Sequence, residues 1–276
     1  MSHHSDTLEA SHPWALVTGA SAGIGAEFCR QLAAKGYQLV LVARRVDRLN
    51  QVAEELKSAY GTTGVVIAAD LSKKDAAENI VKRLAEENIA IECLVNNAGY
   101  GLPGSFHVPD WQEHADFIQV MVTAVCELTW RLLPGMQARE CGQIINISSV
   151  AGLVPSSAGH TLYGASKAFL IKFSESLALE NRAHGVKVAV ICPGFTHSEF
   201  HDVNHTRNVV NQLPGYLWLD AKAVVSDALD AMSNDDISTT VIPGRQYKLI
   251  VWINRYLPWL AAIFFKKSAK HYRVTE

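Results

Sequence analysis

The chain has 276 residues, of which 49% are hydrophobic and 19% charged, and its 25 basic and 27 acidic side chains leave a net charge of -2. This composition excludes an intrinsically disordered chain, and the charge balance lacks the basic stripe expected of a nucleic-acid-binding protein. The five cysteines are scattered without a C-x-x-C pair, and the cysteines and histidines form no mixed cluster. We therefore expect a cytoplasmic protein without disulfides and without a metal site.

Short apolar runs alternate with stretches of helical spacing along the chain. The pattern predicts seven strands, at 14–18, 38–42, 65–69, 91–95, 143–148, 186–191 and 239–242. Between them it predicts helices at 23–35, 46–60, 110–136, 161–184 and 221–232, and one more that begins after Ser72 and ends near Glu87. Ser72 is the expected cap of that helix, and Asp110 the expected cap of the long helix at 110–136. Most of the strands are continuously apolar, which is typical of a sheet buried on both faces. The prediction is an α/β fold: a single Rossmann-type, doubly wound parallel sheet of about seven strands with helices on both faces.

No change of composition interrupts this series, so we expect one catalytic domain at residues 14–244. Residues 1–13 are polar and rich in Ser and His, without the apolar run of a secretory signal, and are expected to be a disordered lead. Residues 245–276 follow the domain as an apolar extension.

The extension contains a mostly apolar stretch at 247–265 that is about long enough to span a bilayer. Asn254, Arg255 and Pro258 lie within it and argue against a spanning helix. Three alternatives stay open: a helix packed on the domain, a subunit interface, or an element lying in a membrane surface, which would give the protein a peripheral membrane contact.

The first predicted strand runs into a glycine-rich turn, TGASAGIG at 18–25. Gly19, Gly23 and Gly25 lie at the joint between strand and helix, where they let the backbone turn tightly and approach a pyrophosphate. The N–H groups of the helix N-terminus and the hydroxyl of Ser21 can donate to the phosphates. In this context the turn predicts a dinucleotide site; a tight turn without a ligand is the alternative.

Two arginines, Arg44 and Arg45, follow the second predicted strand, and no acidic residue comes before Asp47. In dinucleotide folds this strand end faces the adenosine ribose, where an acidic residue binds the 2′-OH of NAD and an arginine pairs with the 2′-phosphate of NADP. A guanidinium group matches the geometry of a phosphate. The prediction is NADP(H) in preference to NAD(H), the alternative being solvated arginines at a helix start.

Five further motifs complete the pattern: Asp70-Leu71, NNAG at 96–99, INISS at 145–149, YGASK at 163–167 and PGFT at 193–196. Together with the glycine turn, and in this order, they resemble the classical short-chain dehydrogenase/reductase family over residues 14–196, and more loosely its NADP(H)-dependent carbonyl reductases. The resemblance implies an oxidoreductase that transfers a hydride between NADP(H) and a ketone, an aldehyde or a secondary alcohol. It also implies a homodimer or homotetramer, and a lid over the substrate near 195–218. The residues that the resemblance and the arginine pair place at the cofactor are Gly19, Ser21, Gly23, Ile24, Gly25, Arg44, Arg45, Asp70, Leu71, Asn97, Ala98, Gly99, Tyr163, Lys167, Pro193, Gly194 and Thr196.

Tyr163 and Lys167 are four residues apart on a predicted helix, so they share one face. An ammonium group about 4 Å from the phenol would stabilise the phenolate by about 4 kcal/mol at an effective dielectric of about 20, which predicts a pKa lowered by up to about three units. By the resemblance, Tyr163 moves the proton on the substrate oxygen, and Lys167 also holds the nicotinamide ribose. Ser149 would donate to the substrate oxygen. Ser148 is the competing choice, although the second serine of the pair is the catalytic one in the family. The spacing from Ser149 to Tyr163 is one residue longer than in the usual form, so the loop at 150–162 is expected to carry a one-residue insertion.

One position departs from the family. Where its members usually have an asparagine that holds a water beside the catalytic lysine, this chain has Met121, and Gln119 and Thr123 are expected to point to other faces. Either the proton relay is altered or slow, or Met121 is an ordinary core residue. A non-catalytic NADP-binding sensor or scaffold is therefore an alternative function.

Apolar side chains in the expected lid predict an apolar substrate pocket. Phe195, Phe200, Leu217 and Trp218 are its expected lining, and Phe106 is expected to face it from the segment after NNAG. The apolar extension adds a further alternative, a reductase of lipid-like carbonyls such as sterols or acyl chains.

Overall fold

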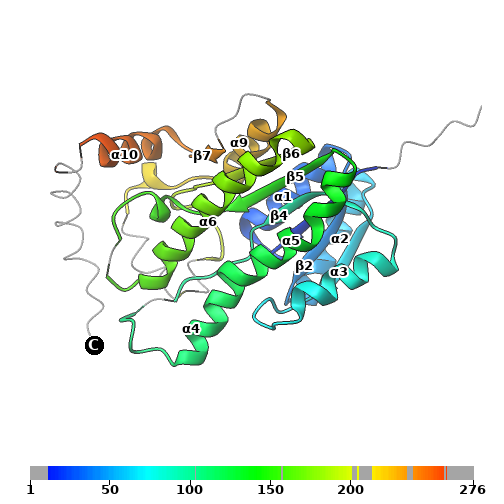
Figure 1. The fold of residues 1–276 in the computed structure, drawn as a ribbon, viewed down its shortest axis with the longest axis horizontal. Helices are drawn as coiled ribbons and strands as arrows, with labels where there is room; N and C mark the ends of the chain where they lie inside the picture. Colours follow the sequence, from blue (N-terminus) through cyan, green and yellow to red (C-terminus); the bar gives the residue numbers. More distant parts are fainter. Residues whose placement is uncertain are drawn as a thin grey trace, which may run out of the picture.

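The structure is a computed structural model that describes residues 12–102, 104–156, 158–200, 204, 213–234, 239–257 and 259. Its centre is a seven-stranded sheet in the order β3-β2-β1-β4-β5-β6-β7, in which every neighbouring pair is parallel (Figure 1). The strands are β1 Trp14–Thr18, β2 Gln38–Ala43, β3 Gly64–Ala68, β4 Ile91–Asn96, β5 Gly142–Ile147, β6 Val186–Ile191 and β7 Thr240–Val241. The strand order reverses between β1 and β4, and the carboxyl ends of these strands therefore border the crevice in which doubly wound folds bind ligands.

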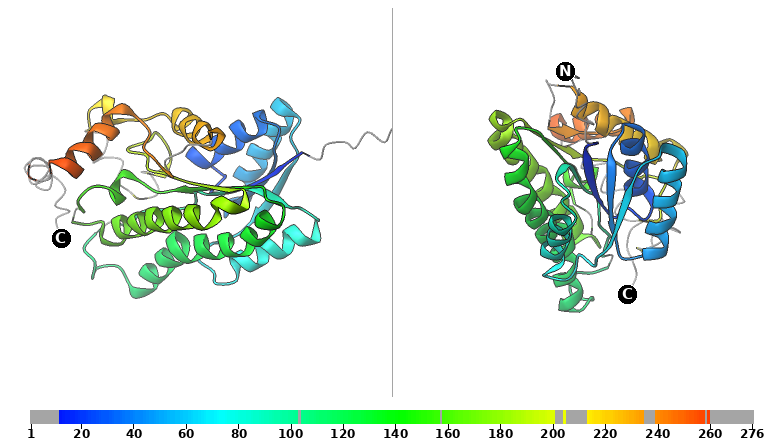
Figure 2. Two further views of the ribbon diagram at one scale, coloured as in Figure 1. Left: turned by 45° about the horizontal axis from the view of Figure 1, so that its top comes forward. Right: turned by 90° about the vertical axis from the view of Figure 1, so that its right-hand side faces the viewer.

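Helices cover both faces of the sheet (Figure 2). One face carries α1 Gly23–Ala34, α2 Val46–Tyr60 and α9 Ala221–Ser233, and the other carries α3 Ala76–Glu86, α4 Trp111–Ile118, α5 Ala124–Ala138 and α6 Thr161–Asn181. Successive strand residues alternate between the two layers: Val17 and Val95 belong to the first, Leu16 and Leu94 to the second. The predicted Rossmann-type sheet with helices on both faces is confirmed.

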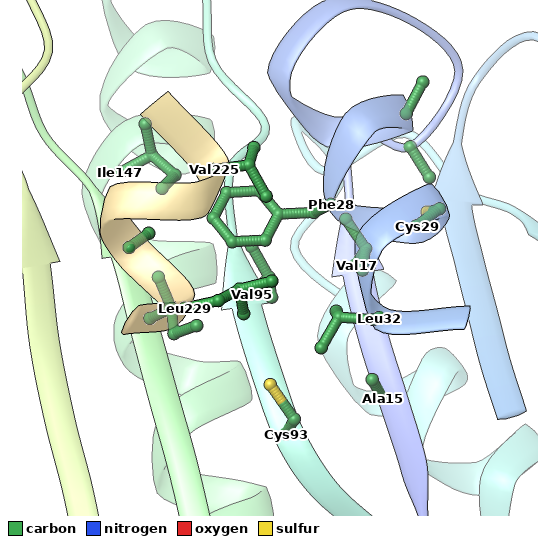
Figure 3. Close-up of a cluster of buried hydrophobic side chains, with 14 of the residues drawn as sticks. Ala15, Val17, Phe28, Cys29, Leu32, Cys93, Val95, Ile147, Val225 and Leu229 are labelled. Carbon is green, nitrogen blue, oxygen red and sulfur yellow. The ribbon is translucent and has the colours of Figure 1, made fainter. Parts of the chain in front are cut away.

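Phe28 of α1 fixes that helix on the sheet. Its ring lies between α1 and α9, next to Val225 and above Val17 and Val95 of the central strands (Figure 3). The ring is fully buried, and burial of a side chain of this size contributes roughly 1.5–3 kcal/mol. The glycine turn that precedes α1 is thereby held at the end of β1.

The two predicted helix caps have different outcomes. Asp110 caps α4 as predicted, in a capping box with Glu113, whose carboxylate accepts the Asp110 N–H at 3.1 Å. Ser72 does not cap α3, because that helix begins later, after Asp75. The Ser72 N–H donates instead to the carboxylate of Asp70 at 3.1 Å, and turns carry the chain to the start of the helix.

The predicted long helix at 110–136 is interrupted. A π-helical turn, Gln119–Thr123, separates α4 from α5 and has Met121 at its middle. Such turns are frequent at functional sites. The sequence pattern could not reveal this one, since an apolar stretch has the same appearance in either kind of helix.

By length and composition, one helical segment of the described residues, Trp111–Ala138, could also cross a membrane. Core helices of soluble proteins pass the same test. Here Phe117 and Leu128 of the segment are fully buried against the sheet.

Only parts of the two predicted flanking segments belong to the described residues. The lead at 1–13 lies outside them except for its last two residues. The extension is described in α10, Arg245–Tyr256, and at 257 and 259. Tyr247 in the first turn of α10 is buried, so the beginning of the extension packs on the rest of the chain.

Candidate active site

The glycine turn has a backbone conformation that favours glycine. Gly19 and Gly23 have φ angles of +67° and +56°, in the left-handed region. Gly25 lies against the turn so closely that a Cβ there would be 2.2 Å from the carbonyl oxygen of Gly19. This glycine cradle, Gly19 to Gly25, has the tight turn before a helix N-terminus that the motif predicts for binding a phosphate.

The NNAG motif is tied to the same turn across the sheet. The Thr18 hydroxyl oxygen accepts the N–H groups of Asn97 and Ala98, both at 3.0 Å. The Asn97 amide donates in return to the Thr18 carbonyl at 2.9 Å. These bonds connect the ends of β1 and β4, so two motifs that are 78 residues apart form one continuous wall of the crevice.

Ser148 and Ser149 have separate roles. The buried Ser148 hydroxyl donates to the carbonyl of Lys167 at 2.8 Å and so serves the packing of α6 on β5. The Ser149 hydroxyl is near enough to Tyr163 to lower the pKa of the tyrosine, and it donates to the carbonyl of Pro193 at 3.4 Å. Of the two serines, Ser149 is the one that shares a site with the tyrosine.

Lys167 lies beneath the tyrosine ring. Its Nζ is 5.6 Å from the centre of the Tyr163 ring and donates to the carbonyl of Ile147 at 2.8 Å. Only 6% of Lys167 is exposed. The three predicted catalytic side chains are thus brought together at the carboxyl ends of β5 and β6, the edge at which the cofactor cradle lies.

The pKa of Tyr163 corrects the sequence-based expectation. Burial raises it to about 12, although the hydrogen bond with Ser149 lowers it in part. Burial also lowers the pKa of Lys167 to about 8. The expectation counted only the attraction between the phenolate and the ammonium group. It left out the cost of removing each charged form from water, and this cost dominates here. Near neutral pH the tyrosine is therefore a phenol, the form that can give a proton to a carbonyl oxygen.

Met121 occupies the space beside the lysine. It is buried, and a Cβ on Gly99 would lie 3.0 Å from its sulfur and 3.9 Å from Nζ of Lys167. Thr123 is exposed, as expected of a residue on another face. The thioether fills the position at which the family usually has an asparagine. It has no amide group that could hold a water beside the lysine.

The two arginines after β2 face different neighbours. The charge of Arg44 acts on Asp70, whose pKa burial would raise but hydrogen bonds from Ser72 and the nearby cations lower. The Arg45 guanidinium donates to the Ser21 hydroxyl at 3.2 Å and to the Glu199 carboxylate at 2.8 Å. Arg45 therefore belongs to the glycine turn, and Arg44 to the end of β3 that leads to Leu71.

The PGFT segment is anchored by a residue that sequence reasoning missed. A Cβ on Gly194 would lie 1.9 Å from Cζ of Tyr247. The Tyr247 hydroxyl accepts the Phe195 N–H at 3.0 Å and donates to the Leu217 carbonyl. Spacing gives no signal for a contact between residues 52 apart. Thr196, in the same segment, donates to the Gly194 carbonyl at 3.1 Å.

The described part of the expected lid covers the tyrosine. The rings of Phe200 and Tyr163 are 5.8 Å apart, and those of Phe195 and Trp218 are 6.0 Å apart. Asn204 accepts the Gly101 N–H at 2.7 Å, another contact that the sequence did not indicate. Residues 201–203 and 205–212 of the lid lie outside the described residues.

Two expected lining residues have other contacts. Phe106 is half exposed and packs on His114 of α4, with ring centres 4.7 Å apart. Leu217 packs in the core layer that includes Tyr247. Of the expected lining residues, Phe200 contacts Tyr163.

Comparisons with known proteins agree with this geometry. The family model of the short chain dehydrogenases matches residues 13–208. The chain is 39% identical over 186 residues to the very-long-chain 3-oxoacyl-CoA reductase-A of Danio rerio, a match that covers 66% of this chain and 57% of that one. This chain therefore spans little more than half the length of that curated relative.

Two solved structures extend the similarity over nearly the whole chain. One comes from work on the stereoselectivity of a 7beta-hydroxysteroid dehydrogenase, with a TM-score of 0.78, 29% identity and coverage of 88% of this chain and 92% of that one. The other is a short-chain dehydrogenase from Sphingobium yanoikuyae in complex with NADPH, with a TM-score of 0.77, 29% identity and coverage of 93% and 95%.

Proposed function

The chain belongs to the short-chain dehydrogenase family, and we propose that it is an NADPH-dependent reductase of apolar ketones or aldehydes with Tyr163 as its proton donor. The observation that carries the proposal is the convergence of Ser149, Tyr163 and Lys167 beside the glycine cradle at one edge of the sheet. Its cytoplasmic location and its assembly into a homodimer or homotetramer stay predictions.

The cradle fits a dinucleotide. Gly19 and Gly25 form the tight turn that dinucleotide folds use to bind a pyrophosphate, and a Cβ at either position would collide with neighbouring protein atoms. Arg45 and Ser21 place a cation and a hydroxyl together beside this turn, which favours the 2′-phosphate of NADP(H). When bound, the nicotinamide supplies a hydride to the substrate carbon.

The side chains of the chain would then handle the oxygen of the substrate. Ser149 and Tyr163 donate hydrogen bonds to the carbonyl oxygen and polarise it. As negative charge develops there, the phenol of Tyr163 transfers its proton. The Lys167 ammonium, 5.6 Å from the ring centre, stabilises the phenolate that forms.

Large apolar carbonyl compounds are the proposed substrates. Phe200 packs on Tyr163 and gives the site an apolar cover. The Danio rerio relative is named for very-long-chain 3-oxoacyl-CoA, and one similar structure for a hydroxysteroid dehydrogenase. A lipid-like substrate, either a sterol or an acyl chain, is therefore the finer form of the proposal.

The proposal is tested by following NADPH oxidation with a graded series of 2-alkanones and with a steroid ketone. We expect kcat/KM to rise with chain length, since each buried methylene contributes about 0.8 kcal/mol. NADH serves as the matched cofactor control and should be less effective. Tight binding of NADPH without turnover of any carbonyl compound would instead support the sensor or scaffold.

The pH profile of the reduction should break near the pKa of Lys167. Below about pH 8 the lysine is charged and stabilises the forming phenolate, and above it the charge is lost. Tyr163 stays protonated up to about pH 12, so its own ionisation does not cause the break. We expect kcat/KM to be flat at low pH and to fall by up to about tenfold per unit above the break.

The check is kcat/KM measured from pH 6 to 10. Lys167→Arg, whose guanidinium stays charged throughout this range, should remove the break whatever its absolute rate. A profile of the parent that shows no fall by pH 10 would contradict the role given to the lysine.

A further inference from the structure

Glu199 forms ion pairs with two arginines at the edge of the proposed cofactor site. Its carboxylate lies 2.8 Å from a terminal nitrogen of Arg45 and 3.7 Å from one of Arg48, in the first turn of α2. Ser21 of the glycine turn adds its hydroxyl to the same group, 3.2 Å from Arg45. Two guanidinium groups are thus directed at one anion, and that anion belongs to the protein.

This cluster borders a cavity of about 590 Å³ that is lined by α1, α2 and the start of α9. Arg30 also lines the cavity, but it is held by Glu27 and Glu55 at 3.2 and 2.7 Å. Arg48, which lines the cavity, and Arg45 both converge on Glu199, next to the turn that would hold the pyrophosphate.

We propose that the Glu199 carboxylate occupies the receptor site for the 2′-phosphate of NADP(H), and that Arg48 joins Arg45 as a ligand of this phosphate. The inference rests on the proposed NADP(H) dependence and deepens it. A carboxylate and a phosphate monoester are bound by the same guanidinium geometry. Two anions repel each other at one receptor, so the phosphate must displace Glu199.

The displacement has a consequence for the substrate side, because Glu199 directly precedes Phe200. The Phe200 ring packs on Tyr163, and the segment is held by the His197 N–H, which donates to the Leu219 carbonyl at 3.0 Å. Release of Glu199 removes one anchor of the segment that covers the tyrosine. Binding of the phosphorylated cofactor therefore loosens the cover before the carbonyl compound enters.

The test uses adenosine 2′,5′-bisphosphate as the probe and 5′-AMP as its matched control without the 2′-phosphate. By calorimetry, Glu199→Gln should bind the bisphosphate about two- to fivefold more tightly, the range that loss of a competing exposed ion pair allows. Binding of 5′-AMP should not change. Arg48→Ala should weaken binding of the bisphosphate only.

Glu55→Gln removes a carboxylate from the same cavity without touching Arg45 or Arg48, and its affinities should equal those of the parent. Equal affinity of the parent and Glu199→Gln for the bisphosphate, in an enzyme that still prefers NADPH, would overturn the inference and leave the proposed function intact. A parent that binds the bisphosphate no better than 5′-AMP would overturn both.

Hydrogen exchange supplies the second readout. In the parent, saturating bisphosphate should raise exchange at the amides of residues 197–200, and 5′-AMP should not. Unchanged exchange with both ligands would overturn the coupling to the cover.

Discussion

Tyr163→Phe is expected to lower kcat for carbonyl reduction by a factor of about 10³, equivalent to about 4 kcal/mol in the barrier. The substitution removes only the hydroxyl. The phenylalanine ring can keep the packing on Phe200 and the position over Lys167. Since Ser149 and Lys167 remain, the loss measures the proton transfer itself.

The measurement is single-turnover NADPH oxidation at saturating ketone, with NADPH binding determined separately. Affinity for NADPH should change little in Tyr163→Phe. Tyr60→Phe, on the exposed end of α2, is the control and should match the parent. A phenylalanine enzyme with the rate of the parent would refute the proposed mechanism, whereas loss of NADPH binding would point to damage of the site.

The sequence predicted those features that depend on local rules. The glycine turn is one, because the left-handed φ angles at Gly19 and Gly23 exclude most other residues. The cap at Asp110 is another, since an acceptor at the first position and Glu113 three residues later act within one turn. The parallel sheet follows from the alternation of apolar runs and helices.

Contacts between distant segments were not predictable in the same way. Arg45 was expected at the cofactor phosphate, but its ion pair with Glu199 joins residues 154 positions apart. Ser72 failed as a cap because turns follow it and α3 begins only after Asp75. The Arg45 side chain had more than one suitable partner, and only the packing of the folded chain selects one.

The electrostatics of the site could not be derived from spacing either. The four-residue separation correctly placed Tyr163 and Lys167 on one face of α6. It carried no information on burial, and burial determines that the pKa of the tyrosine rises and that of the lysine falls. A pattern thus located the catalytic pair, and the fold set its protonation states.

Gly194→Ala is expected to destabilise the protein by about 3 kcal/mol, at the upper end of the usual cost of overpacking. The added methyl carbon would lie 1.9 Å from Cζ of Tyr247, within its ring. The ring cannot move away easily, because its hydroxyl binds the Phe195 N–H and the Leu217 carbonyl. Either α10 or the PGFT segment must shift, and with it the wall of the active site.

A double-mutant cycle with Tyr247→Ala, measured by urea unfolding, isolates this clash. In the Tyr247→Ala background the added methyl group meets no ring, so Gly194→Ala should cost far less than in the parent. Gly215→Ala is the control, since no atom lies within 4 Å of the Cβ it would add. An equal cost of Gly194→Ala in both backgrounds would show that the contact with Tyr247 is not what requires glycine there. A large coupling would establish that α10 and the segment after β6 are built as one unit around this tyrosine.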